Sequence, residues 1–197
     1  MAVSLVRARG SGKLETLDPS AIPASCRLRP IRGEMVNLGV GDVVVYGAHG
    51  VGSVEARGTR SLDGEQQTVV VIAFAGGLSV QLPLTLAQAQ LRAVVDAQGI
   101  AAIQAVLRAP LPLSKDPWLK RRRDSKAKMR DPIGLAEIIR DGNARETALA
   151  RRPGSQLSPG ERELLRRARE LLANEIALAR GIAVEEAGAW LDAQLTG

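Results

Sequence analysis

The stretch GDVVVYGAHGVGSV, residues 41–54, decides the fold of the first half of this 197-residue chain. It carries a β-branched run, Val43–Tyr46, bounded by glycines, and β-branched residues continue after those glycines. Two similar runs follow, QQTVVVIAF at 66–74 and GLSVQLPL at 77–84. Short β-rich runs separated by glycine-containing turns are typical of a small antiparallel barrel or curled sheet.

Turn residues punctuate these runs. Asp63-Gly64 fits a tight hairpin, and Pro83 is expected to close the last strand or mark an edge. The glycines at 47, 50 and 52 do not form a phosphate-binding loop, because no Gly-Lys-Ser/Thr follows them and strand residues lie on both sides. We expect them to reverse the chain between two strands, with His49 as a turn residue whose ring is exposed.

Strands give way to helices after about residue 85. Asp116-Pro117 and Asp131-Pro132 each predict a helix with Asp as N-cap and Pro at the first helical position. Ser158 and Glu161 form a capping box, and Gly181 stops the same helix. Its apolar stripe, interrupted only by Glu175, comprises Leu164, Leu165, Ala168, Leu171, Leu172, Glu175, Ile176 and Ala179. The chain is therefore predicted to be α+β, a small β-barrel followed by a compact helical bundle.

Composition limits the possible functions. Lys and Arg total 27 against 21 Asp and Glu, a net charge of +6, so a polyanion such as nucleic acid is a plausible partner. A single Cys26 and a single His49 argue against a metal cluster or a catalytic pair, so we expect no enzyme activity, cofactor or small-molecule ligand. No apolar run is long enough to span a membrane, and no secretory signal is evident, which favours a cytoplasmic protein.

The first 34 residues mix Arg, Gly, Ser and Pro without a steady period. We expect residues 1–34 to be a disordered extension. Because Met35 directly precedes the first regular segment, it is also a hypothetical translation start.

The densest positive charge lies in KDPWLKRRRDSKAKMRDP, residues 115–132, and Trp118 near its start is one of only two tryptophans in the chain. Two interpretations remain open. Trp118 either packs against a neighbouring helix of the bundle, or it acts as a planar wedge on a helix that contacts phosphates. Trp190, on a short acidic helix, is expected to pack onto the bundle.

The order of these motifs resembles the CarD/CdnL family of bacterial transcription regulators. The resemblance rests on VGDVVVYGAHGVGSVE, DGEQQTVVV, LSVQLPL, VLRAP, the Trp-plus-basic segment and LSPGERELLRRARELLANEIALA, and it covers roughly residues 36–180. It implies a Tudor-like barrel at 36–86 that binds the β subunit of RNA polymerase, and a helical domain at 92–195 that contacts promoter DNA. A protein of this kind would be associated with the nucleoid.

The resemblance also assigns residues. It implies that Trp118 wedges into the minor groove at the upstream edge of the transcription bubble and slows bubble collapse. The DNA-contacting set is then Trp118, Lys120, Arg121, Arg122, Arg123 and Lys126. Arg60 and Gln81 fall at the polymerase-binding positions, although relatives often have a basic residue at the second. Either the affinity for polymerase is weaker here, or the contact has shifted to another residue. A small barrel with this opening also resembles KOW-type modules, and RNA or ribosome binding is the alternative.

Overall fold

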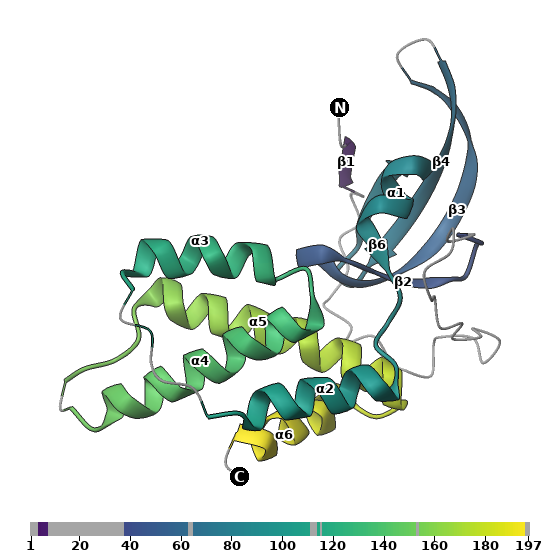
Figure 1. The fold of residues 1–197 in the computed structure, drawn as a ribbon. Coiled ribbons are helices and arrows are strands. Elements are labelled where there is room, and N and C mark those ends of the chain that lie inside the picture. The colour runs from purple at the N-terminus through teal and green to yellow at the C-terminus, as the bar shows by residue number, and fades with distance from the viewer. Residues whose placement is uncertain are drawn as a thin grey trace. The chain divides into compact units, whose positions relative to one another are not determined.

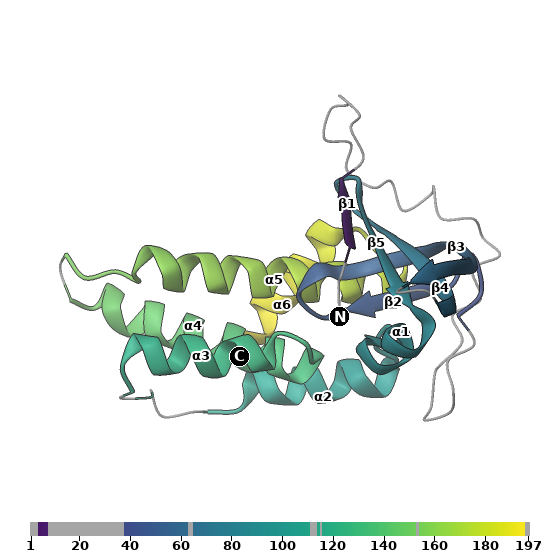
Figure 2. The same ribbon diagram turned by 90° about the horizontal axis from the view of Figure 1, so that it is seen from above.

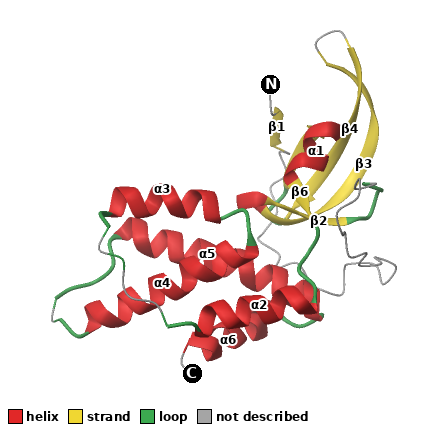
Figure 3. Ribbon diagram, in the orientation of Figure 1, coloured by secondary structure: helices red, strands yellow, loops and turns green. Residues whose placement is uncertain are grey.

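The computed structural model describes residues 4–7, 38–62, 65–110, 114, 116–152 and 154–195 of the chain. It divides into two compact units, Met1–Val94 and Val95–Gly197. Strands form the first unit, together with one short α-helix and a 3-10 turn, whereas α-helices form the second (Figure 3). The predicted α+β fold, a barrel-like antiparallel domain followed by a helical part, is confirmed.

The first unit is one antiparallel sheet with strand order β1-β5-β4-β3-β2-β6. Its strands are β1 (Ser4–Arg7), β2 (Val43–Tyr46), β3 (Gly50–Leu62), β4 (Glu65–Phe74), β5 (Leu78–Pro83) and β6 (Leu91–Arg92). β3 and β4 are the longest and lie side by side over most of their length (Figure 1). Leu62 pairs with Glu65, and the predicted hairpin residues Asp63 and Gly64 lie outside the described residues.

The glycine-rich stretch reverses the chain as predicted. The 3-10 turn η2 (Gly47–His49) joins β2 to β3, and Tyr46 pairs with Gly50 across it. The exposed His49 ring stacks on Tyr46, with ring centroids 5.1 Å apart. A Cβ at Gly52 would lie only 2.6 Å from the Ala73 carbonyl oxygen, so this position requires glycine.

Alternation along β4 and β5 buries one face of the sheet. Val70, Ile72 and Phe74 of β4 are buried while the residues between them are half-buried, which is the period of two that strands impose. Pro83 ends β5, as predicted, and a proline there interrupts no later pair. The core comprises Leu38, Val44, Val54, Val70, Ile72, Phe74, Val80, Leu82, Ala87 and Leu91.

Two expectations for this part of the chain were incomplete. Ser4–Arg7 form β1 and pair with β5, so residues 1–34 are not wholly without regular structure; the rest of that range lies outside the described residues. The first unit also continues beyond residue 86, because α1 (Leu84–Gln90) leads into β6, which pairs with β2. The sequence did not reveal β6, since a two-residue strand carries no periodicity.

The second unit contains α2 (Ala97–Arg108), α3 (Trp118–Lys128), α4 (Pro132–Ala150), α5 (Pro159–Arg180) and α6 (Val184–Leu195). Seen from above, α4 and α5 run alongside each other (Figure 2). Asp131 caps α4, Ser158 and Glu161 form the capping box of α5, and Gly181 ends α5 in the left-handed conformation, all as predicted. Within the described residues, no helix is long and apolar enough to cross a membrane.

The apolar stripe of α5 forms the centre of this second core. Leu165, Ala168, Leu171, Leu172 and Ile176 are buried there. Glu175, the polar exception, is 1% exposed and accepts a hydrogen bond from the Val95 backbone N–H (3.1 Å). The half-buried Trp190 packs against the same cluster, as predicted, with the Arg180 guanidinium 4.3 Å from its ring.

Candidate nucleic-acid interface

The basic run forms α3, a helix of 11 residues in which no side chain is fully buried. The sequence predicted Asp116 as its N-cap, but Pro117 occupies that position and the cap has no side-chain hydrogen bond. The Asp116 carboxylate instead accepts a hydrogen bond from Lys120 Nζ (3.0 Å), which holds the pKa of Asp116 below its usual range. The start of α3 is therefore stabilised by a side-chain ion pair, because the helix has no fully buried apolar face.

Residues three and four apart share one side of a helix, and this divides α3 into two faces. The inner face comprises Trp118, Arg121, Asp124, Ser125 and Lys128, all of which line a cleft of about 210 Å³ against α4 and α5. The outer face comprises Leu119, Arg122, Arg123 and Lys126, which are all exposed. Leu119 is 77% exposed, and the three cations lie three, four and seven residues after it.

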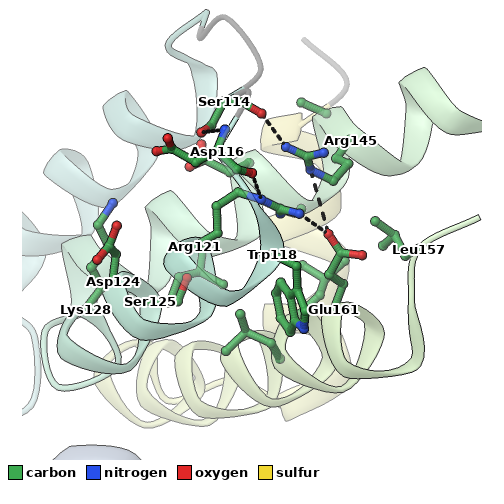
Figure 4. Close-up of a pocket in the computed structure, with 16 residues that line it drawn as sticks. Ser114, Asp116, Trp118, Arg121, Asp124, Ser125, Lys128, Arg145, Leu157 and Glu161 are labelled. Atoms are coloured by element: carbon green, nitrogen blue, oxygen red, sulfur yellow. Dashed lines mark hydrogen bonds and ion pairs between the residues drawn. The ribbon is translucent and has the colours of Figure 1, made fainter.

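Arg121 on the inner face is tied to α5. Its Nη2 donates to Glu161 Oε1 (2.6 Å) and its Nε donates to the Asp116 carbonyl oxygen (3.1 Å), as Figure 4 shows. The Arg121 and Glu161 side chains are only 21% and 13% exposed. In the free protein, Arg121 is therefore paired with a carboxylate and largely shielded from solvent.

Glu161 serves two helices at once. Its Oε2 accepts from the Ser158 hydroxyl (2.7 Å) and backbone N–H (3.0 Å), which completes the cap of α5. Arg145 of α4 approaches Oε1 at 4.0 Å and donates to the Ser114 carbonyl oxygen (2.7 Å), as Figure 4 also shows. Burial alone would raise the pKa of Glu161, but the hydrogen bonds from Ser158 and Arg121 outweigh it and hold the pKa below its usual range.

Trp118 lies at the start of α3 and is half-buried. A Cβ at Gly160, near the N-terminus of α5, would lie 3.1 Å from Trp118 Cζ2, so the ring rests against that glycine. The Arg121 guanidinium carbon is 5.5 Å from the ring centroid, within the range of a cation–π contact. In the free protein, part of the Trp118 side chain therefore packs against another helix, as the first of the two interpretations of the sequence expected.

The six residues assigned to DNA contact differ in their availability. Arg122 and Lys126 form no ion pair with any described residue. Arg123 approaches Asp124 at 3.9 Å but is 79% exposed, and Lys120 is paired with Asp116 in an exposed position. Exposed pairs of this kind contribute about 0–1 kcal/mol and exchange readily. Of the four arginine and lysine residues after Trp118, Lys120 to Arg123, Arg121 is the one that lines the cleft and is paired with Glu161.

The two residues assigned to polymerase contact lie on different strands of the first unit. Arg60 of β3 pairs with Gln67 of β4, and Gln81 of β5 pairs with Val71 of β4. These β4 partners are four residues apart, so both side chains lie on the sheet face away from the core, about 13 Å apart along the strand. Arg60 is exposed and Gln81 is half-buried.

Two family models match this chain, one in each unit. The CarD-like/TRCF RID domain matches residues 38–95, and the CarD C-terminal domain matches residues 102–192. The chain belongs to the CarD/CdnL family. CarD proteins are RNA polymerase-interacting, non-enzymatic transcription factors, and the second unit, with its basic α3, carries the C-terminal domain of that family.

Three residues of this site were not predicted from the sequence. Glu161 was recognised only as a helix cap, and Arg145 and Leu119 were not singled out. No pattern in the sequence could join Glu161 to Arg121, because 40 residues separate them. The signal for Leu119 was available, since it is the large apolar residue three and four positions before Arg122 and Arg123.

Proposed function

We propose that this CarD protein stabilises the promoter open complex. The first unit would hold it on the β subunit of RNA polymerase, and α3 would contact DNA at the upstream edge of the transcription bubble. The observation that supports this most is the outer face of α3, where Arg122, Arg123 and Lys126 surround an exposed Leu119 beside Trp118. Cations supply affinity for phosphates without reading sequence.

The apolar side chains would supply the preference for melted DNA. Aromatic and aliphatic side chains next to basic residues insert at base steps or stack on unpaired bases. One stacked base is worth about 1–3 kcal/mol. Because a binder shifts an equilibrium only by its differential affinity, and about 1.4 kcal/mol corresponds to tenfold, a Trp118 contact made only in the open state has a suitable size.

Polymerase binding would make this weak DNA contact effective. A positively charged helix of this size binds DNA alone with low affinity and strong salt dependence. Attachment to polymerase converts the contact into an intramolecular one with a high effective concentration. The protein itself is then expected to contribute little promoter specificity.

Two binding measurements on the full chain test this proposal. The chain should co-purify with RNA polymerase rather than with ribosomes, and it should bind fork-junction DNA more tightly than duplex DNA of the same length. Trp118→Ala should remove the fork preference while leaving polymerase binding unchanged. Co-purification with ribosomes or RNA, and no preference for forks, would instead favour the KOW-type RNA-binding alternative.

A further inference from the structure

Trp118 of α3 contacts one residue of α5 directly and a second one through Arg121. Trp118 and Arg121 lie one helical turn apart on α3, and the arginine joins the tryptophan ring to Glu161 on α5. The ring itself rests on Gly160, the residue before Glu161. Gly160, which contacts the ring, and Glu161, which holds Arg121, therefore both lie in the first turn of α5.

Among the described residues, one ion pair joins α3 to α5 and another joins it to α4. The α3 helix buries no side chain completely, and its N-cap lacks a side-chain hydrogen bond. Lys128 at the far end forms an ion pair with Glu137 of α4 (2.7 Å). At the Trp118 end, the ion pair from Arg121 to Glu161 is shorter and more shielded from water than the pair from Lys120 to Asp116.

We propose that Glu161 is a positioning residue for Trp118, which sets the orientation in which the tryptophan meets melted DNA. This inference rests on the proposed function and adds a residue that does not touch DNA. Glu161 fixes Arg121, Arg121 covers one side of the indole, and Gly160 leaves room for the other. The capping box fixes Glu161 in turn, because Ser158 holds its second oxygen.

A glutamine at position 161 separates positioning from helix capping. The capping box accepts Gln as well as Glu, so the amide oxygen can still accept from Ser158. The amide nitrogen then faces Arg121, a donor against a donor. Glu163→Gln is the matched control, because it removes the same charge two residues later, where Glu163 contacts Arg166 on its own helix.

The first measurement is the half-life of the open complex formed with RNA polymerase. Glu161→Gln should shorten it roughly two- to fivefold, the factor for an ion pair of moderate strength, and Glu163→Gln should not. In a Trp118→Ala background the Glu161→Gln change should have no further effect, because it acts through the tryptophan. An equal effect in both backgrounds, or no effect relative to Glu163→Gln, would overturn the positioning role.

A second measurement needs neither polymerase nor DNA. With Trp190→Phe, Trp118 is the remaining tryptophan, and iodide quenching of its fluorescence reports its exposure. Glu161→Gln should increase quenching at a temperature where circular dichroism shows that the variant is folded, and unchanged quenching would contradict the inference. Gly160→Ala offers a second route, because its methyl group must displace the ring by a few tenths of an ångström. If quenching changes but Trp118→Ala has no effect on half-life, positioning holds and the proposed function fails.

Discussion

Adjacent arginines on α3 are predicted to behave in opposite ways. Arg122 forms no ion pair among the described residues, whereas Arg121 is bound to Glu161 at 2.6 Å. Each phosphate contact contributes about 0.9 to the slope of log affinity against log salt. Arg122→Ala should lower that slope by about 0.9, and Arg122→Ala with Lys126→Ala by about 1.8. Raising the salt from 50 to 200 mM should therefore weaken DNA binding by the double variant roughly twelvefold less than it weakens binding by the wild-type chain.

Arg121→Ala removes the same charge and is the matched comparison. It should leave the salt slope nearly unchanged but lower the free energy of unfolding by about 1–2 kcal/mol, because it leaves a shielded carboxylate without its closest cation. Fluorescence anisotropy with labelled fork DNA gives the slopes, and urea titration gives the stabilities. Equal slopes for Arg121→Ala and Arg122→Ala, or a loss of stability in Arg122→Ala, would refute the division of α3 into two faces.

Four further predictions follow from individual contacts. The folded-state pKa of Glu161 lies below its usual 4.5, so the stability that Glu161 contributes is present above that pH and is lost as the pH falls through the folded pKa. In Glu161→Gln, the free energy of unfolding measured by urea titration should therefore fall less steeply than in the wild type between about pH 5 and 3. Gly134→Ala should lower the free energy of unfolding by about 2 kcal/mol or more in the same titration, because its methyl group would overlap the Lys128 backbone carbonyl. Leu119→Ala should weaken fork binding about three- to tenfold, roughly half the value of burying a leucine, with no loss of melting temperature. Gln81→Arg should tighten binding to RNA polymerase in a pull-down titration, because it restores a charged donor; unchanged affinity would argue that position 81 is not part of that contact.

The sequence predicted the elements whose cause is local. Asp131, the Ser158–Glu161 capping box and Gly181 were found because a helix end is specified by residues within one turn of it. Pro83 was found because a proline cannot donate in a strand ladder. The predicted start of α3 was one residue too early. An Asp-Pro pair in the sequence does not show whether the Asp side chain caps the helix backbone or pairs with a lysine.

The functional site was less predictable than the fold because its contacts join distant segments. The sequence identified α3 and its cations from composition and family resemblance. It could not distinguish Arg121 from Arg122, since only the folded bundle brings Glu161 within hydrogen-bonding distance of the first. Likewise, pairing between β1 and β5 depends on two segments more than 70 positions apart, which no local period encodes.

Trp118 is proposed to prolong the open state of a promoter. The most direct test is the half-life of competitor-resistant open complexes formed by RNA polymerase with no added protein, with the wild-type chain, and with Trp118→Ala at a concentration that saturates polymerase. We expect a longer half-life with the wild-type chain, and a return to the polymerase-only value with Trp118→Ala. A half-life that the wild-type chain does not change, or that Trp118→Ala prolongs equally, would contradict it.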